Sequence, residues 1–547
     1  MEKAKVGKKR LFKFVRKVVG IGFLAFFTAV SIFGFNSQSQ AKTFTMVTEY
    51  EAKSMDPNDI SDYGRIYVRA NMYDGLTRYQ GFPAVLEPWL AESWEAASEA
   101  KEWTFHLRKG VRFHDGSEMT AEDVVYSVEK LLHGGKGIAG TMSKFVKPGA
   151  TEPVDKYTVR FHLTQPCSLF DGLTQSIFVL NKNVLKRHEE NGDYGNKWLA
   201  IHGSRLGKNG VGTGAYTLTE WKPGNYLTFE KFSDFWKKWN QPHMKDVRVE
   251  IVYENATRII GLRKGRYHYW NMPLTYDTVQ TLMKSPLLQE LHRPFPKLEY
   301  IHLNNRKPPT NDIHFRKALC YALDYETLID GVLHGYVERC IGYIPPAIIG
   351  SLDPRKDWHY TYDLDKAREE LAKCEVDYKK YEPLEIQLFD TPELTTMGEM
   401  LLVALQKLGI KGRFKIVTWP TWCELASKPE TAPLIAPIGL SPYYLDPDHY
   451  SRVVDSRGFG THMGTSWYEN PKIEEMHMKA LATPNKEERI ELYKQAQRIE
   501  LQDASHVWVS QWNYHNALNK DIGGLENYSP YGALQEFREI YFKSEWK

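Results

Sequence analysis

The chain has 547 residues, more than one hydrophobic core usually supports, so its length predicts at least two domains. Hydrophobic residues make up 42% and charged residues 25% of the sequence, which is typical of a folded soluble protein. The formal net charge is +3, but residues 1–41 carry eight basic residues and one acidic residue, so the remainder has a net charge of −4. Without a basic stripe in that remainder, the sequence predicts no nucleic-acid partner.

The first 41 residues have the pattern of a secretory signal peptide. The basic stretch Met1–Lys17 is followed by the apolar run VVGIGFLAFFTAVSIFGF and then by Asn36–Ala41. Because Ser39 and Ala41 are small residues at the −3 and −1 positions, we expect cleavage after Ala41. The alternative is a permanent membrane anchor, since the apolar run is about long enough to span a bilayer.

The first marked element of the mature chain is a helix that begins after Thr120. Asp123 stands three residues after Thr120 and completes a capping box, acids occupy the first turn, and Lys130 falls near the end. A Gly-Gly pair stops the helix at Gly134. The predicted apolar stripe consists of Val124, Val128, Leu131 and Leu132.

Strands follow this helix. YTVRFHL, residues 157–163, alternates apolar and polar side chains and predicts a half-buried strand. AYTLTEWKPGNYLTFEKF, residues 215–232, predicts a hairpin whose turn is Lys222–Asn225.

From about residue 311 the sequence becomes more helical. Residues 311–336 predict two helices broken near Asp324, and residues 364–373 predict another. Residues 400–419 read as a helix, a glycine stop and a strand, and a helix over 485–504 precedes a strand-like return at 506–518. This order predicts the α/β class, with a second domain inserted between two parts of the first.

The sequence offers little to support catalysis, a metal or a cofactor. It contains no His-Glu-x-x-His, no Gly-x-Ser-x-Gly and no complete phosphate loop, and the glycines of GVGTGAY lead into a strand. We therefore predict no metal and no cofactor. In an oxidising compartment the cysteines allow one or two disulfides, with at least one thiol left over, and their pairing cannot be read from the sequence. They are Cys167, Cys320, Cys340, Cys374 and Cys423.

One acid pair needs an explanation. It lies in GLSPYYLDPDHY, where Asp446 and Asp448 flank Pro447. Asp-Pro favours a turn in which the carboxylate caps its own backbone, and this is the interpretation we favour. The alternatives are a ligand contact and the carboxylate pair of a secreted hydrolase.

Six blocks of the mature chain carry a recognisable order of residues. The blocks are YDGLTRY (73–79), PWLAESWE (88–95), WTFHLRKGVRFHDGSEMTAEDVVYSVEKL (103–131), GTGAYTLTEWKPG (212–224), FRKALCYALDYETLIDGVLHGY (315–336) and YDLDKAREELAK (362–373). The longest block is the most specific, because so long an ordered match is improbable by chance. Together the blocks resemble the family 5 extracellular solute-binding proteins, the peptide- and nickel-binding components of ABC importers.

The resemblance implies a fold and a function. The fold is the two-lobe α/β periplasmic binding-protein fold of type II, similar to dipeptide- and oligopeptide-binding proteins. Lobe I, with a family-type subdomain, would span 42–302 and 507–547, lobe II would span 303–506, and hinge crossings would fall near 300–304 and 507–510. The implied function is that of a monomeric periplasmic receptor that closes on a small solute and delivers it to an inner-membrane ABC permease, without enzymatic chemistry. A sensory receptor on the same scaffold is the alternative.

The family motif places an unexpected residue at the ligand. Peptide-binding members carry an Asp, ahead of an Asp-Pro-Asp motif, that grips the ligand's α-ammonium. Aligning that motif with Asp446–Asp448 places Tyr443 at the position of the gripping Asp. A buried ammonium without a carboxylate costs several kcal/mol, so a peptide held by its amino terminus is disfavoured unless Glu49 or Glu51 substitutes.

Aromatic residues stand at other positions that the resemblance places near the cleft. Flat rings with hydrogen-bonding tips suit sugars, opine-like conjugates and also apolar peptide side chains. We therefore expect an oligosaccharide or sugar conjugate as the ligand, with an oligopeptide as the alternative. The expected ligand contacts are Glu49, Tyr50, Glu51, Trp270, Asn271, Trp419, Trp422, Tyr443, Tyr444, Asp446, Trp512 and Tyr514.

Overall fold

A computed structural model of the chain describes most of the mature sequence. The described residues are 42–59, 66–81, 84–97, 99–239, 243–388, 392–524 and 536–545. The predicted signal peptide and its cleavage after Ala41 lie outside them. Among the described residues, no helix has the length and apolar character needed to cross a membrane.

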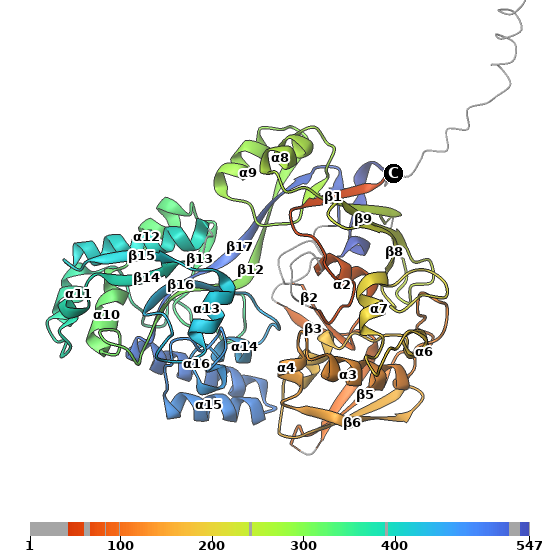
Figure 1. Ribbon diagram of the computed structural model, residues 1–547, viewed down its shortest axis with the longest axis horizontal. Coiled ribbons are helices and arrows are strands. Elements are labelled where there is room, and N and C mark those ends of the chain that lie inside the picture. The colour runs from red at the N-terminus through yellow and green to blue at the C-terminus, as the bar shows by residue number, and fades with distance from the viewer. Residues whose placement is uncertain are drawn as a thin grey trace, which may run out of the picture. The chain divides into compact units, whose positions relative to one another are not determined.

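A long mixed sheet organises the structure. Its strand order is β15-β14-β16-β12-β17-β11-β1-β10-β9-β8, and β13 pairs with β17 off this path. The two longest strands, β12 (Leu288–Leu303) and β17 (His506–Asn519), are antiparallel partners at its centre. Figure 1 shows them running side by side from β16 to the region of β1. The other strands are β1 (Phe44–Thr48), β8 (Tyr216–Lys222), β9 (Tyr226–Lys231), β10 (Asp246–Ile251), β11 (Tyr269–Trp270), β13 (Val337–Arg339), β14 (Leu384–Leu388), β15 (Gly412–Ile416) and β16 (Ile435–Leu440).

Smaller sheets accompany the long one. A four-stranded antiparallel sheet has the order β4-β5-β7-β6, and two pairs, β2-β3 and β18-β19, stand alone. Val159, Phe161 and Leu163 of β7 are buried, as its alternation predicts. The strands are β2 (Thr77–Gln80), β3 (Val85–Pro88), β4 (Ala91–Ala97), β5 (Glu102–Leu107), β6 (Val146–Asp155), β7 (Thr158–Leu163), β18 (Ile522–Gly523) and β19 (Tyr541–Phe542).

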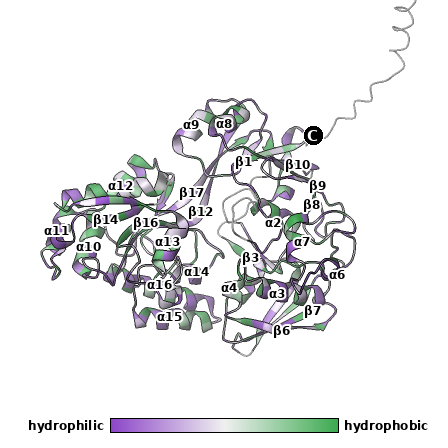
Figure 2. Ribbon diagram, viewed as in Figure 1, coloured by the Kyte–Doolittle hydropathy of each residue, from purple (hydrophilic) through white to green (hydrophobic). Residues whose placement is uncertain are grey.

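The helices divide into two groups along the chain. Before β12 they are α2 (Ile66–Met72), α3 (Ala121–Gly134), α4 (Ala139–Met142), α5 (Phe170–Leu173), α6 (Lys182–Arg187), α7 (Asn196–His202), α8 (Asn255–Arg263) and α9 (Tyr276–Met283). Between β12 and β17 they are α10 (Ile313–Ala322), α11 (Leu364–Leu371), α12 (Pro392–Lys407), α13 (Trp419–Ala426), α14 (Pro447–Ser451), α15 (Pro471–Ala482) and α16 (Lys486–Asp503). Figure 2 shows hydrophobic and hydrophilic residues mixed along α15, as a helix with one buried face requires.

Three large buried clusters fill the interior. Core A is built from residues between Leu298 and Val509. Core B combines residues from Phe44 to Tyr269 with Leu518 and others near the carboxyl end. Core C is built from Leu76 to Val179, joined by two residues from the later part of the chain, Tyr444 and Leu481. Because β12 and β17 each contribute to core A and also reach core B, these two strands connect the cores.

The predicted helix after Thr120 is confirmed in detail. Thr120 and Asp123 form the capping box, and Gly135 adopts φ 62° at the carboxyl end, a left-handed conformation that glycine adopts without strain. The sequence led us to expect Lys130 as one of the charges near the helix end, but its environment in the structure is different. It is buried, and its Nζ lies 2.7 Å from Asp56 Oδ2, so its function is to neutralise a buried carboxylate.

The later elements also follow the sequence. The hairpin forms from β8 and β9, a break separates α10 from the next helical turn near Asp324, and α12 stops before Gly409 ahead of β15. The five cysteines are all free thiols, three of them buried. No disulfide therefore stabilises the fold in this structure.

Candidate functional site

The acid pair that the sequence singled out begins a short helix. Asp446 is the N-cap of α14, and its side chain accepts a hydrogen bond of 2.8 Å from the backbone N–H of Asp448. Its carboxylate also forms an ion pair with Arg489 of α16. The capping interpretation is thus confirmed, and both interactions use the same carboxylate oxygen.

Asp448 lies deeper, in a network of buried ions. Arg457 approaches its carboxylate at 2.6 Å and Arg452 at 3.5 Å, and the Tyr444 hydroxyl donates to it at 2.8 Å. Burial opposes ionisation, but the two guanidinium groups outweigh it and hold the pKa of Asp448 far below its usual value. Asp455 continues the network by accepting from both Arg457 and His477.

This network argues against the hydrolase alternative. A general acid at neutral pH needs a raised pKa and access to substrate. Asp448 has a strongly lowered pKa and is 1% exposed, while Asp446 is held by Arg489 and by the helix that it caps. Asp446 and Asp448 therefore stabilise the loop that follows β16. The two tyrosines that precede them in the chain belong to this stabilised loop.

Those two tyrosines face different surroundings. Tyr443 is 48% exposed, whereas Tyr444 is buried and belongs to core C. Leu481, the other late residue of core C, accepts a hydrogen bond of 2.9 Å at its carbonyl from the Ser168 N–H. Tyr444 is therefore a packing residue that joins two parts of the structure.

An exposed aromatic patch lies on the segment that carries core A. We define it as Trp419, Tyr443 and His462. The ring of His462 makes edge contacts with Trp419 at 5.6 Å and with Tyr443 at 6.1 Å. Burial lowers the pKa of His462, which keeps the imidazole neutral at physiological pH. Because Trp419 is 46% exposed, the patch presents two large rings to solvent.

Trp422 follows Trp419 by one helical turn but lies inside core A. It is fully buried, and its ring meets His302 edge to face at 5.7 Å. Its position in α13 is that of a core residue.

A second group of expected residues gathers at the end of β1. Trp270 is 3% exposed, and its Nε1 donates to Glu49 Oε2 at 2.9 Å. The Arg258 guanidinium lies 4.4 Å from the Trp270 ring centre and 3.8 Å from Glu49 Oε1. Asn271 is buried beside them and donates its backbone N–H to Val47.

The two residues after Glu49 are held differently. The Tyr50 side chain is exposed, and its carbonyl accepts from the Tyr67 hydroxyl at 3.3 Å. Glu51 accepts from the N–H of Gly224 in the hairpin turn at 2.6 Å. Both glutamates that were considered as anchors for an ammonium thus already accept an internal hydrogen bond.

A third group lies where β12 and β17 pass between the cores. Phe295 and Tyr514 pack at 4.7 Å, Trp512 packs against them, and Lys297 Nζ lies 5.2 Å from the Trp512 ring centre. The pairing of the strands is irregular here, because the register shifts between Pro294 and Leu298.

The same strands bring together residues that the sequence did not single out. The ring of His515 stacks on Tyr336 at 3.5 Å and on His292 at 4.3 Å. Its Nδ1 lies 2.7 Å from Glu290, which also accepts from the Tyr336 hydroxyl. These four residues come from β12, β17 and the segment just before β13, so only strand pairing reveals their proximity.

The expected residues therefore form three groups. Trp419 and Tyr443 meet through His462, Glu49 meets Trp270, and Trp512 meets Tyr514. Among the described residues, no group of three or more His, Cys, Asp or Glu side chains is arranged to hold a metal ion.

Comparisons with known proteins identify the family. Residues 85–459 match the model of the bacterial extracellular solute-binding proteins, family 5. The chain is 30% identical over 442 residues to the probable D,D-dipeptide-binding periplasmic protein DdpA of Escherichia coli, covering 80% of this chain and 81% of that protein. It is 25% identical over 533 residues to the dipeptide-binding protein of the same organism, covering 92% and 95%.

Solved structures agree on the fold. The periplasmic binding protein DppA from Helicobacter pylori, in complex with the peptide STSA, superposes with a TM-score of 0.74 at 24% identity, covering 92% of this chain and 98% of that chain. The substrate-binding protein CtaP from Listeria monocytogenes superposes with a TM-score of 0.80 at 22% identity, covering 92% and 99%. The predicted two-lobe α/β fold is thereby confirmed, and the chain belongs to the family 5 bacterial extracellular solute-binding proteins, the periplasmic substrate-binding components of ABC importers.

Proposed function

We propose that this protein binds short peptides in the periplasm and delivers them to an ABC permease in the inner membrane. The observation that carries the proposal is the 30% identity, over four-fifths of both chains, to a protein named for D,D-dipeptides. A second relative is named for dipeptides and a third for oligopeptides. The peptide alternative is therefore better supported than the sugar that the sequence led us to expect.

We also propose lobe boundaries that are based on the three cores. We place lobe II around core A, and lobe I around cores B and C. We place the hinge crossings where the register is irregular and the packing is separate from every large core, at 294–297 in β12 and 511–514 in β17. These hinge positions are a few residues away from the crossings expected at 300–304 and 507–510. We move them because Leu298–Leu303 and His506–Val509 pack within or beside core A. Hinges need only a few residues to absorb the change in backbone angles.

The exposed rings are the proposed walls of the peptide site. Trp419, Tyr443, Tyr50 and Trp512 keep ring surface outside the cores, so a ligand can cover them without unfolding any packing. Trp422 and Tyr444 are packing residues in this proposal, and Asp446 fixes the loop that presents Tyr443.

The ammonium of a peptide needs a carboxylate partner. Glu49 and Glu51 are the candidates, since an ionised carboxylate has about four acceptor sites and each of these two accepts an internal hydrogen bond at one of them. With Tyr443 in the position of the family's Asp, we propose that the amino terminus is bound from the β1 side of the site.

Calorimetry and thermal unfolding of the purified protein test the ligand class. The probes are D-Ala-D-Ala, L-Ala-L-Ala, tri-L-alanine and maltotriose, each added to protein that has been unfolded, dialysed and refolded to remove cargo. A peptide present at a hundredfold excess over its Kd stabilises the folded state by about 2.7 kcal/mol and raises the unfolding temperature. Binding of maltotriose with no response to any peptide would overturn the proposal and restore the sugar ligand.

A further inference from the structure

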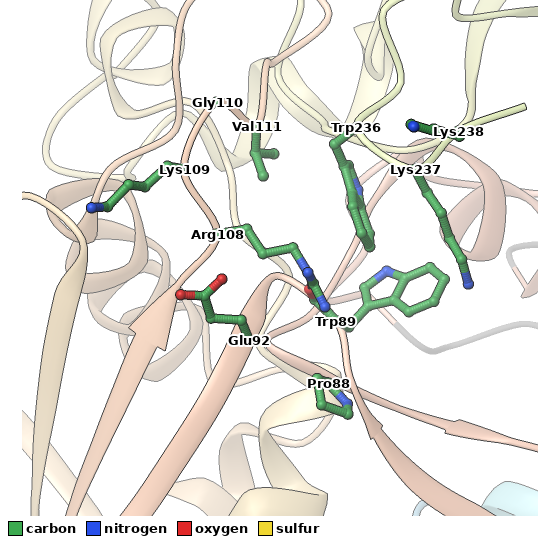
Figure 3. Close-up of a pocket in the computed structure, with 10 residues that line it drawn as sticks. All are labelled: Pro88, Trp89, Glu92, Arg108, Lys109, Gly110, Val111, Trp236, Lys237 and Lys238. Carbon is green, nitrogen blue, oxygen red and sulfur yellow. The ribbon is translucent and has the colours of Figure 1, made fainter.

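A pocket of about 590 Å³ is lined by none of the residues proposed to bind peptide. It is lined by residues at the end of β3, in β4, after β5 and in the segment after β9. Its size falls within the range of small-molecule sites. The lining residues, shown in Figure 3, are Pro88, Trp89, Glu92, Arg108, Lys109, Gly110, Val111, Trp236, Lys237 and Lys238.

Two indoles in the wall of this pocket are held in a fixed arrangement. Trp89 Nε1 donates to Asp74 Oδ1 at 2.7 Å, and Trp236 Nε1 donates to the other oxygen of Asp74 at 3.3 Å. The two rings meet edge to face at 5.0 Å. Because both polar tips are bound to one buried carboxylate, the rings keep this arrangement without a ligand.

The pocket is strongly cationic. Arg108, Lys109, Lys237 and Lys238 line it against a single acid, Glu92. Within the described part of the chain, none of the four cations has an ion-pair partner within 4.0 Å. Arg108 donates its Nε to the Trp89 carbonyl at 2.5 Å, which holds the guanidinium in place and leaves its other nitrogens for a ligand.

Two of the four cations, Arg108 and Lys237, lie close to the tryptophan rings. The Arg108 guanidinium lies 5.2 Å from the Trp236 ring centre, and Lys237 Nζ lies 4.7 Å from that of Trp89. Figure 3 shows Arg108 reaching toward Trp89 and Lys237 on the other side of that ring, while the Lys109 side chain extends away from both indoles. Partial burial beside Trp89, together with the charge of Arg538, lowers the pKa of Lys237 against the opposing effect of three carboxylates, so a bound anion would favour its charged form. These carboxylates belong to Glu539, Glu536 and Glu87.

An ordinary basic surface, whose lysines are simply solvated, would show neither the hollow nor the fixed indoles. Scattered surface lysines do not converge on a hollow, and they are not accompanied by indoles held by a common carboxylate. We propose that this pocket binds a phosphate-type anion attached to a small flat or apolar body, independently of the peptide site. Arg108 and Lys237 would bind the anion through charge-assisted hydrogen bonds, and Trp236 and Pro88 would contact the body.

Phenyl phosphate is the probe that carries both features. Titration calorimetry at low ionic strength is expected to show one site with a Kd below about 1 mM, the range that one or two charge-assisted contacts provide. Phenol, which lacks the charge, and inorganic phosphate, which lacks the ring, should each bind at least about tenfold more weakly. Raising the salt from low to physiological concentration should weaken binding, because the attraction is between charges.

Variants locate the site. Arg108→Gln and Lys237→Gln are each expected to weaken phenyl phosphate binding at least about tenfold, while Lys472→Gln, an exposed lysine of α15, leaves it unchanged. Since Lys237 is on the surface, its replacement does not threaten folding, and an unchanged unfolding temperature verifies this. Binding of a peptide should be the same in all three variants, which separates this pocket from the proposed function.

Vesicles identify the source of the anion. Co-sedimentation with phosphatidylglycerol vesicles, but not phosphatidylcholine vesicles, that is lost in Lys237→Gln would assign the site to a lipid headgroup. Phenyl phosphate binding without such co-sedimentation would assign it to a soluble phosphate ester. No binding of phenyl phosphate at 10 times the expected Kd, about 10 mM, or equal binding by wild type and both pocket variants, would overturn the proposal.

Discussion

Glu500 is predicted to make the stability of this protein fall as the pH rises from acid to neutral. It lies fully buried in α16, where it accepts hydrogen bonds from the Ser505 hydroxyl at 2.5 Å and from Trp508 Nε1 at 2.6 Å. Burial raises the pKa of its carboxyl from 4.5 to about 7, because the charged form loses its hydration. The folded protein therefore holds this proton more tightly than the unfolded chain does.

The direction and size of the effect follow from proton linkage. Below about pH 4.5 the carboxyl is protonated in both states, and its contribution to stability is fully present. As the pH rises to about 7, the unfolded chain ionises first and stability is lost. Each pKa unit corresponds to about 1.4 kcal/mol, so the difference of about 2.5 units amounts to about 3 kcal/mol above pH 7.

The substitution Glu500→Gln replaces the titrating carboxyl with an amide that does not titrate. One of the two donors, Ser505 or Trp508, loses its acceptor, which costs about 1 to 3 kcal/mol at every pH. The difference in unfolding free energy between variant and wild type should nevertheless shift in favour of the variant by about 2.5 kcal/mol between pH 5 and pH 8. Urea unfolding followed by circular dichroism at four pH values measures this shift.

A matched control separates Glu500 from the other titrating groups. The buried histidines, such as His302, have lowered pKa values and contribute in the opposite direction, but they are the same in both proteins and cancel in the difference. Glu475→Gln, on an exposed residue of α15, should give a profile parallel to that of wild type. If the Glu500→Gln profile is also parallel to wild type, the reasoning about the buried carboxyl is refuted.

Four further predictions concern the loop, the buried lysine, the aromatic patch and the export signal. Asp446→Asn should lower the free energy of unfolding by about 3 kcal/mol, because it leaves a buried guanidinium without its charged partner, and urea unfolding measures this; a loss of peptide affinity with unchanged stability would contradict the structural role. Lys130→Met should cost a similar 3 to 5 kcal/mol, about the cost of breaking a buried pair, and a neutral result in the same assay would contradict the buried pairing. Tyr443→Ala should weaken peptide binding about tenfold by calorimetry while changing stability by less than about 1 kcal/mol, whereas Tyr381→Ala, also exposed, should change neither. N-terminal sequencing of exported protein should begin at Lys42, and an intact N-terminus would favour the membrane anchor.

Much of the local structure was predictable because the interactions that form it join residues close in the chain. The capping box between Thr120 and Asp123 and the turn at Lys222–Asn225 each depend on a few consecutive residues. The Asp446 cap is of the same kind, since its acceptor and donor are two residues apart. These elements need no knowledge of the tertiary fold.

The partners of buried charges were not predictable in the same way. Lys130 reaches an aspartate 74 residues earlier in the chain, and Arg489 reaches Asp446 across 43 residues. Such pairs exist only after the segments have packed, and no pattern near either residue announces them. The cationic pocket has the same origin, because its lining comes from three separate segments of the chain, at 88–92, 108–111 and 236–238.

Residue order alone was enough to identify the family, the α/β class and the succession of helices and strands, since these depend on local patterns and long ordered blocks. Which rings face solvent was decided by packing. Trp419 and Trp422 stand on one helix, three residues apart, yet the first is half exposed and the second is enclosed by core A. Burial depends on what a helix face meets in three dimensions, and that information belongs to the assembled fold rather than to the spacing of its aromatic residues.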